Sequence, residues 1–114
     1  MTEPTIWISQ DRRELDFSAA GRFGKLRAVF DRQFNPFDLP AELERVRKLV
    51  HEESGPHDWL ILAGSGVTCS LLSLVYSERW GRLPLLIYHT NRREYVKREV
   101  ITNRRLVTQY VGDP

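Results

Sequence analysis

Residues 57–81 read HDWLILAGSGVTCSLLSLVYSERWG, and this stretch decides the fold class. Its apolar run from Asp58 to Ala63 lacks polar alternation, which is typical of a central strand covered on both faces. Gly64-Ser65-Gly66 then permits a tight turn, and apolar residues recur at helical spacing from Val67 until Gly81. We therefore predict a buried strand that turns sharply into a packed helix.

The residues after this helix predict a second strand beside the first. Leu85–Tyr88 is another short apolar run, reached over a short loop. A strand, a helix and a strand at this spacing form a βαβ unit, so we expect parallel strands and a right-handed crossover. After a polar turn at residues 89–93, Glu94–Ile101 should pair back as a hairpin. The tail contains Leu106–Val111, which we interpret as an edge strand or an irregular segment.

The N-terminal half predicts two more strands and a second main helix. The strands are Thr5–Ser9 and Lys25–Asp31, with a single helical turn in residues 16–24 between them. Asp38 is a plausible cap for a helix that ends at Ser54-Gly55-Pro56. The fold class is therefore α/β: a small mixed sheet of about five strands, two main helices and a central right-handed βαβ unit.

Composition limits the class of protein. The chain has 114 residues, 41% of them hydrophobic and 28% charged, which predicts one folded domain over residues 1–114. Its one cysteine, Cys69, excludes an internal disulfide and points to a reducing compartment. The three histidines lack metal-ligand spacing, so no metal site is assigned. No signal pattern or membrane-length apolar run occurs, and we expect a cytoplasmic protein with no membrane partner.

The glycine turn is one candidate site. A turn between a strand and a helix can hold a phosphate or carboxylate on backbone N–H groups. The candidate anion-binding residues are Gly64, Ser65, Gly66 and Thr68. The stretch does not match a dinucleotide-binding motif, because Cys69 occupies the position of the third glycine. The sequence also contains no Walker A motif. The competing interpretation, which we favour, is that the glycines simply allow a tight turn.

Cys69 would lie in the first turn of the helix, where the dipole lowers a thiol pKa. A nucleophile also needs a base, and His89 could reach the same edge of the sheet. A small cysteine that packs a helix against a sheet is the more common case. We therefore assign no catalytic residue and no cofactor.

The basic hairpin is the second candidate site. Residues 82–114 carry 7 Lys or Arg against 3 Asp or Glu. The candidate partner-binding residues are Arg92, Arg93, Tyr95, Lys97, Arg98, Arg104 and Arg105. Together with Tyr88 and Tyr110 they combine cations with stacking rings, which suits single-stranded nucleic acid or an acidic protein. The competing interpretation is that these charges only protect edge strands from aggregation.

We therefore expect a non-enzymatic accessory or regulatory protein that binds a protein or nucleic acid through this hairpin, with a homodimer of paired edge strands as one form. The alternative is a phosphate, nucleotide or small-anion site at Gly64-Ser65-Gly66, with catalysis not excluded. Phe34 and Phe37 flank Pro36 in a predicted loop, Gln33–Phe37. Their rings either plug the core or form a contact patch for a partner.

Overall fold

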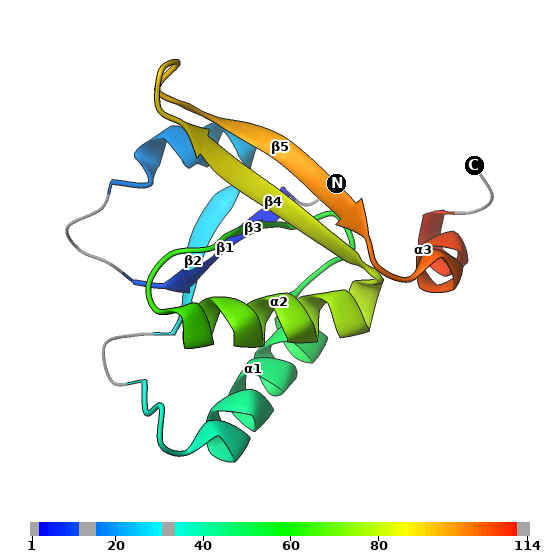
Figure 1. Cartoon of the computed structure of the whole chain (residues 1–114). Coiled ribbons are helices and arrows are strands. Elements are labelled where there is room, and N and C mark those ends of the chain that lie inside the picture. Colours follow the sequence, from blue (N-terminus) through cyan, green and yellow to red (C-terminus); the bar gives the residue numbers. More distant parts are fainter. Residues whose placement is uncertain (1–2, 12–15, 31–33, 112–114) are drawn as a thin grey trace.

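The computed structural model describes residues 3–11, 16–30 and 34–111, which form one five-stranded sheet in the order β2-β1-β3-β4-β5 (Figure 1). The strands are β1 (Thr5–Gln10), β2 (Lys25–Phe30), β3 (Trp59–Ile61), β4 (Arg82–His89) and β5 (Glu94–Ile101). The β2-β1, β1-β3 and β3-β4 pairs are parallel, and β5 returns antiparallel to β4. The α/β class and the hairpin at one edge are confirmed.

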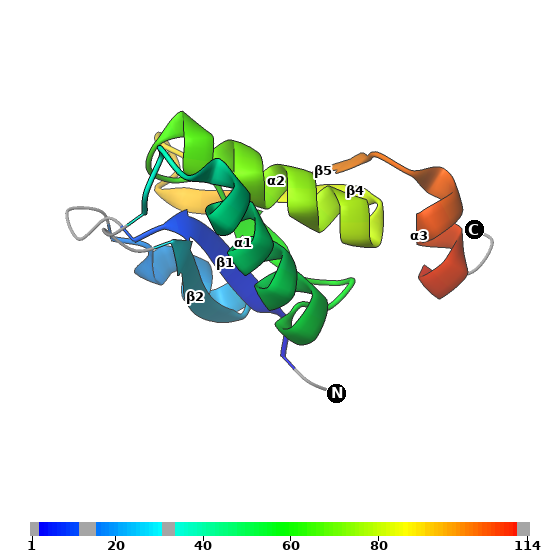
Figure 2. The same ribbon diagram turned by 90° about the horizontal axis from the view of Figure 1, so that it is seen from below.

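Two helices cover one face of the sheet. These are α1 (Leu39–Glu53) and α2 (Gly66–Trp80), and a 3-10 helix, η1 (Ser18–Phe23), lies on the opposite face (Figures 1 and 2). The connection through η1 leads from β1 outward to β2, whereas α2 leads from β3 in the other direction to β4. In the β3-α2-β4 unit the helix connects two neighbouring parallel strands, as predicted. The connections after β1 and after β3 therefore lead to opposite sides of the sheet, which makes the gap between these two strands a topological switch point. Ligands in open α/β sheets commonly bind at the carboxyl ends of the strands beside such a point.

The two faces of the sheet have separate cores. The core under α1 and α2 contains Trp7, Val29, Phe30, Val46, Val50, Leu60, Leu72, Val75 and Tyr76. The core under η1 contains Ile6, Ile8, Ala20, Ile61, Leu86 and Tyr95. Successive residues of β1 and β3 thus pack on opposite faces, and Ile6–Ser9, Leu60 and Ile61 are all buried, which explains the apolar runs without alternation.

Both main helices begin and end at the expected residues. The Asp38 carboxylate accepts from the Ala41 N–H at 3.3 Å, and the Ser65 hydroxyl accepts from the Thr68 N–H at 3.2 Å. These contacts satisfy amides that the first helical turn leaves without partners. Gly81 ends α2 with φ of 75°, and its N–H donates to the Ser77 carbonyl at 2.8 Å. A left-handed residue at this position favours glycine.

The tail is a helix, which corrects the prediction of a strand or irregular segment. This helix is α3 (Arg104–Val111), and the Asn103 side chain caps it by accepting from the Leu106 N–H at 3.2 Å. The Tyr110 hydroxyl donates to the Trp80 carbonyl at 2.6 Å, and the two rings meet edge to face. The helix therefore depends on a contact with α2 that lies 30 residues away in sequence.

The second predicted strand also differs in detail. β2 is an edge strand, predicted to be mostly buried, on which Val29 and Phe30 are buried but Ala28 and Lys25 are exposed. The predicted last residue of this strand, Asp31, and the first residue of the predicted loop, Gln33, lie outside the described residues.

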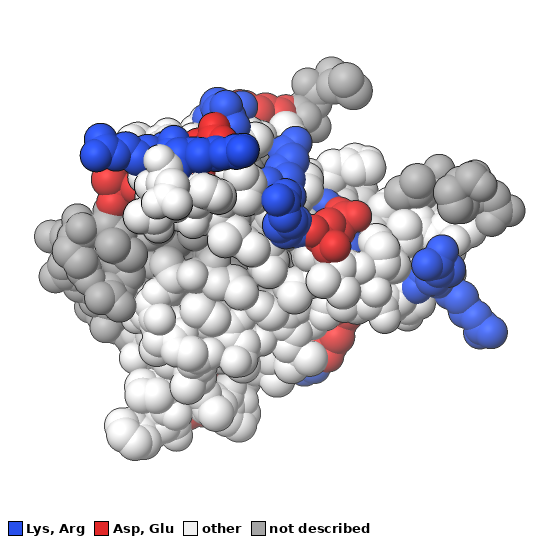
Figure 3. Space-filling model, turned by 45° about the horizontal axis from the view of Figure 1, so that its top comes forward, with Lys and Arg blue, Asp and Glu red and all other residues white. Residues whose placement is uncertain are grey.

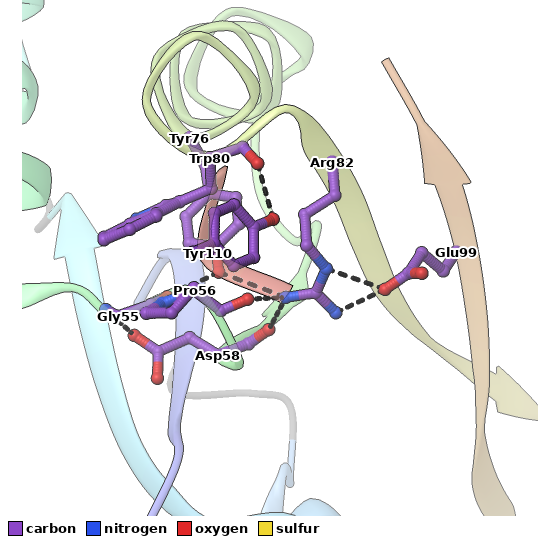
Figure 4. Close-up of polar contacts among 8 residues, drawn as sticks. All are labelled: Gly55, Pro56, Asp58, Tyr76, Trp80, Arg82, Glu99 and Tyr110. Atoms are coloured by element: carbon purple, nitrogen blue, oxygen red, sulfur yellow. Dashed lines mark hydrogen bonds and ion pairs between the residues drawn. The ribbon is translucent and has the colours of Figure 1, made fainter. Parts of the chain in front are cut away.

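A buried polar cluster lies at the edge of the sheet where the parallel strands β1, β3 and β4 begin, which we call the amino edge (Figure 4). The Asp58 carboxylate accepts from the Thr5 N–H at 2.9 Å, from the Trp7 indole at 2.9 Å and from the Gly55 N–H at 2.8 Å. The side chain is 6% exposed. The buried carboxylate thus accepts three hydrogen bonds, as a buried charged group requires. Because two of the donors belong to β1, these bonds link β1 to the segment that begins β3.

Arg82 and Tyr76 complete the cluster (Figure 4). The Arg82 guanidinium donates to the Pro56 and Asp58 carbonyls at 2.6 and 3.0 Å, and its Nε donates to Glu99 at 2.7 Å. The Tyr76 hydroxyl donates to the Gly55 carbonyl at 2.7 Å, and burial raises the pKa of this phenol. Because these groups satisfy one another, the cluster has a structural role.

Candidate functional site

The carboxyl edge of the sheet opens where β3 stops. β3 pairs with β4 at one described position, Leu60 against Leu85, whereas β4 continues to His89 paired with β5 alone. The β4–β5 hairpin consequently rises away from the other strands (Figure 1). Gln10 and the glycine turn lie at this same edge, beside the topological switch point. Both predicted sites therefore border the carboxyl edge of the sheet.

The glycine turn is held by Gln10. Gly64 has φ of 95°, and a Cβ on it would lie 2.2 Å from Gln10 Oε1. That oxygen accepts from the Ser65 N–H at 2.9 Å. The Thr68 N–H is bound by Ser65, and the Thr68 hydroxyl is buried and donates to the Ser65 carbonyl at 2.9 Å. The predicted anion-binding residues are thus close together, but two of the amides an anion would need are already bound.

Cys69 is packed between β1 and the turn. Its sulfur lies 3.5 Å from the Ser9 hydroxyl and 3.7 Å from the Ala63 carbonyl oxygen. His89 lies in the hairpin, where its Nδ1 accepts from the Arg92 N–H at 3.2 Å. The Cys69 side chain thus packs against Ser9 of β1 and the Ala63 carbonyl. Within the described residues, no three His, Cys, Asp or Glu side chains are grouped to hold a metal ion.

The hairpin presents cationic side chains on its exposed surface (Figure 3). Arg92 lies 3.8 Å from Glu94, and Arg93 occupies the left-handed region with φ of 53°. Lys97 lies over the Trp59 ring, 5.0 Å from its centroid. Arg98 is exposed and donates to the Lys97 carbonyl at 2.7 Å. These four predicted residues are brought together on one element.

The other three predicted partner-binding residues are not part of this exposed surface, Tyr95 because it is buried and the two arginines because they lie on α3. Tyr95 is 6% exposed and meets the Tyr88 ring edge to face at 5.2 Å, so its ring is not presented to a partner. Burial, followed by the neighbouring Tyr88 and Asp16, raises the Tyr95 pKa. Arg104 and Arg105 begin α3 and do not belong to the hairpin. The tyrosine interpretation is thereby corrected, since it had placed Tyr95 among exposed stacking rings.

Comparison with protein families identifies the chain. The model of the family described as Phage Pam3 gp32-like protein matches residues 5–102. This chain belongs to that family. No curated protein and no solved structure matches it significantly. The match to the Pam3 gp32-like family runs from β1 through β5 and ends before α3, so it includes the glycine turn and the hairpin but excludes Arg104 and Arg105.

Sequence reasoning missed two features of this Pam3 gp32-like protein, a cavity and the exposed apolar residues of β5, and it left the placement of Phe34 and Phe37 open. An apolar cavity of about 680 Å³ lies where β3 and β4 separate. Val100 and Ile101 are 56% and 41% exposed on β5, and Phe37 is 95% exposed, whereas Phe34 packs on Phe30. The available signal was that Val100 and Ile101 are consecutive, because neighbouring residues of a strand point to opposite faces and one core cannot bury both. Within the described part of the chain, no helix is both long and apolar enough to cross a bilayer.

Proposed function

We propose that this Pam3 gp32-like protein is a non-enzymatic accessory protein that binds an acidic partner protein along the outer edge of β5. The supporting observation is the position of β5: it is eight residues long and ends the sheet of the described residues. An edge strand offers backbone N–H and C=O groups to which an extended peptide can add another strand. Exposed Val100 and Ile101 offer apolar contacts beside them.

The charges on the hairpin indicate that its partner carries negative charge. Residues 82–101 carry five Lys or Arg and two Glu. Glu99 is engaged by Arg82, and Glu94 lies near Arg92. Arg93 and Arg98 are exposed, and their described polar contacts include no carboxylate, whereas Lys97 lies over the Trp59 and Phe23 rings. An acidic strand beside β5 would therefore place carboxylates against cations, which favours correct partners and fast association.

A protein partner fits this surface better than single-stranded nucleic acid. Binding to single strands uses exposed aromatic rings on which bases stack. Tyr95 is buried and Tyr110 packs on Trp80, which leaves Tyr88, 46% exposed, as the accessible tyrosine of the hairpin. A strand that adds to β5 needs backbone hydrogen bonds in place of such rings.

The test uses an acetylated eight-residue peptide of alternating Glu and Val, matched in length to β5. We expect saturable binding by fluorescence anisotropy that weakens steeply between about 50 and 300 mM salt. Arg98→Glu should weaken binding about tenfold or more, because it puts a carboxylate beside the peptide's carboxylates. Arg104→Glu is the matched control, because that arginine lies on α3, and it should have little effect.

Three outcomes would contradict this proposal. A peptide methylated on alternate backbone nitrogens that binds as well as the parent would exclude strand addition. A preference for oligo(dT) over the acidic peptide would indicate that this surface binds nucleic acid and not a protein. Concentration-dependent dimerisation that Arg98→Glu leaves intact, together with no peptide binding, would assign the β5 edge to a second copy.

The glycine turn remains the alternative, supported by its place at the topological switch point. Binding of inorganic phosphate would raise the melting temperature. If phosphate did bind there, Gly66→Val would abolish the rise, and the position has room for a Cβ because no described atom lies within 4 Å of it. With Ser65 and Thr68 amides already bound, we expect no rise.

A further inference from the structure

A cavity separate from the outer edge of β5 lies between the diverging ends of β3 and β4. Its volume is about 680 Å³, within the range of roughly 300–1,000 Å³ typical of small-molecule sites. It is lined by Asp16, Phe17, Ile61, Leu62, Ala63, Leu85, Leu86, Ile87, Tyr88 and Tyr95. Phe17, Ile61, Leu86 and Tyr95 belong to the core on the face opposite α1 and α2. The cavity is therefore an opening in that core.

The described lining residues are apolar or aromatic except for one charged group, Asp16. The carboxylate of Asp16 is exposed and accepts from the Ser18 N–H at 2.9 Å. This hydrogen bond lowers the Asp16 pKa, so the group is ionised at neutral pH. Among the described residues that line the cavity, there is no lysine, arginine or histidine. The Asp16 carboxylate would therefore repel an anion in the cavity and attract a cation.

Two aromatic rings lie in the same wall. Tyr88 and Tyr95 meet at a centroid distance of 5.2 Å, and Asp16 is near enough to contribute to the raised pKa of Tyr95. Rings that present a negatively polarised face beside a carboxylate are the usual surroundings of an organic ammonium group. The apolar walls formed by Ile61, Leu62 and Leu86 would cover a hydrocarbon body.

We propose that this cavity binds a small organic amine, with its ammonium group beside Asp16 and the Tyr88–Tyr95 pair and its apolar body between β3 and β4. The inference does not depend on the proposed partner, because β5 binds that partner at its outer edge, whereas the cavity is on the inner side of the hairpin. The chemistry discriminates by charge: an amine is favoured over an alcohol of the same shape, and an acid is disfavoured.

Three probes of one shape test this proposal on the full chain: 1-naphthylmethylamine, 1-naphthylmethanol and 1-naphthoate. Titration calorimetry should show the amine binding up to about fivefold more tightly than the alcohol, and the carboxylate binding least. The amide signals that shift in NMR spectra should be those of residues 16–17, 61–63, 85–88 and 95.

Asp16→Asn should remove the preference for the amine while leaving the alcohol's affinity unchanged. This substitution keeps an oxygen for the Ser18 N–H at an exposed position, so folding is not at risk. Glu44→Gln, an exposed carboxylate on α1 remote from the cavity, is the matched control and should have no effect. Leu62→Trp should weaken all three probes by filling the cavity.

Equal affinities for the three probes would overturn the role of Asp16. Absence of amine binding at millimolar concentration, or shifts confined to other residues, would overturn the site itself.

Discussion

Asp58→Asn is the substitution that best tests how the amino edge of the sheet is held together. The carboxylate receives three donors: Oδ2 is shared by the Trp7 indole and the Gly55 N–H, and Oδ1 takes the Thr5 N–H. An asparagine oxygen can replace Oδ2, but its NH₂ group would then face the Thr5 N–H, donor against donor. Hydrogen bonds to a charged group contribute about 1.5–3 kcal/mol each, and an unsatisfied buried donor costs about 1–3 kcal/mol.

We therefore expect Asp58→Asn to lower the free energy of unfolding by about 3 kcal/mol, and the melting temperature by about 12 °C in a domain of this size. Urea denaturation followed by tryptophan fluorescence measures the first quantity, and the Trp7 indole N–H signal in an NMR spectrum should move. Asp38→Asn is the matched control, because that carboxylate caps α1 from an exposed position and asparagine caps equally well. A cost for Asp58→Asn within about 0.5 kcal/mol of the control would refute the reasoning.

Two further predictions concern the glycine turn and alkaline pH. Gly64→Ala should destabilise the fold by about 2 kcal/mol, because φ is 95° and the new Cβ would meet Gln10, whereas Gly21→Ala, with no described atom within 4 Å, should be close to neutral in the same urea titration. Burial raises the Tyr76 pKa, so the unfolded chain loses this proton first and stability should fall as pH rises above about 10. Tyr76→Phe should be less stable than the parent at pH 7, because it loses the bond to Gly55, yet show a shallower decline in alkaline melting experiments; an unchanged slope would contradict the assignment.

The sequence was sufficient for elements whose signals are local. The Asp38 cap, the Gly81 stop and the apolar run at Asp58–Ala63 predicted the main helices, the βαβ unit and the hairpin at one edge. Periodicity and capping depend on neighbours within a few residues, which is why these predictions were confirmed.

Features that depend on distant contacts were not predictable in this way. α3 requires Tyr110 to reach Trp80, and the burial of Tyr95 requires η1 to lie in the core on that face. The cavity exists because β3 stops pairing after Leu60, a length that its apolar run does not reveal. The role of Asp58 was also missed, because we counted this residue as part of the apolar run. A carboxylate at the start of a covered strand does indicate that a buried donor lies nearby, and here that donor is the Trp7 indole.

The position of β1 has a consequence for folding during synthesis. β1 leaves the ribosome first, yet one neighbour, β3, begins at Trp59, more than fifty residues later in translation order. Contacts of such separation form slowly, and an incomplete chain exposes Trp7 and Ile8 until β3 emerges. The β4–β5 hairpin, by contrast, closes over a short turn once it is made. A chain stalled before residue 59 would therefore be a substrate for chaperones.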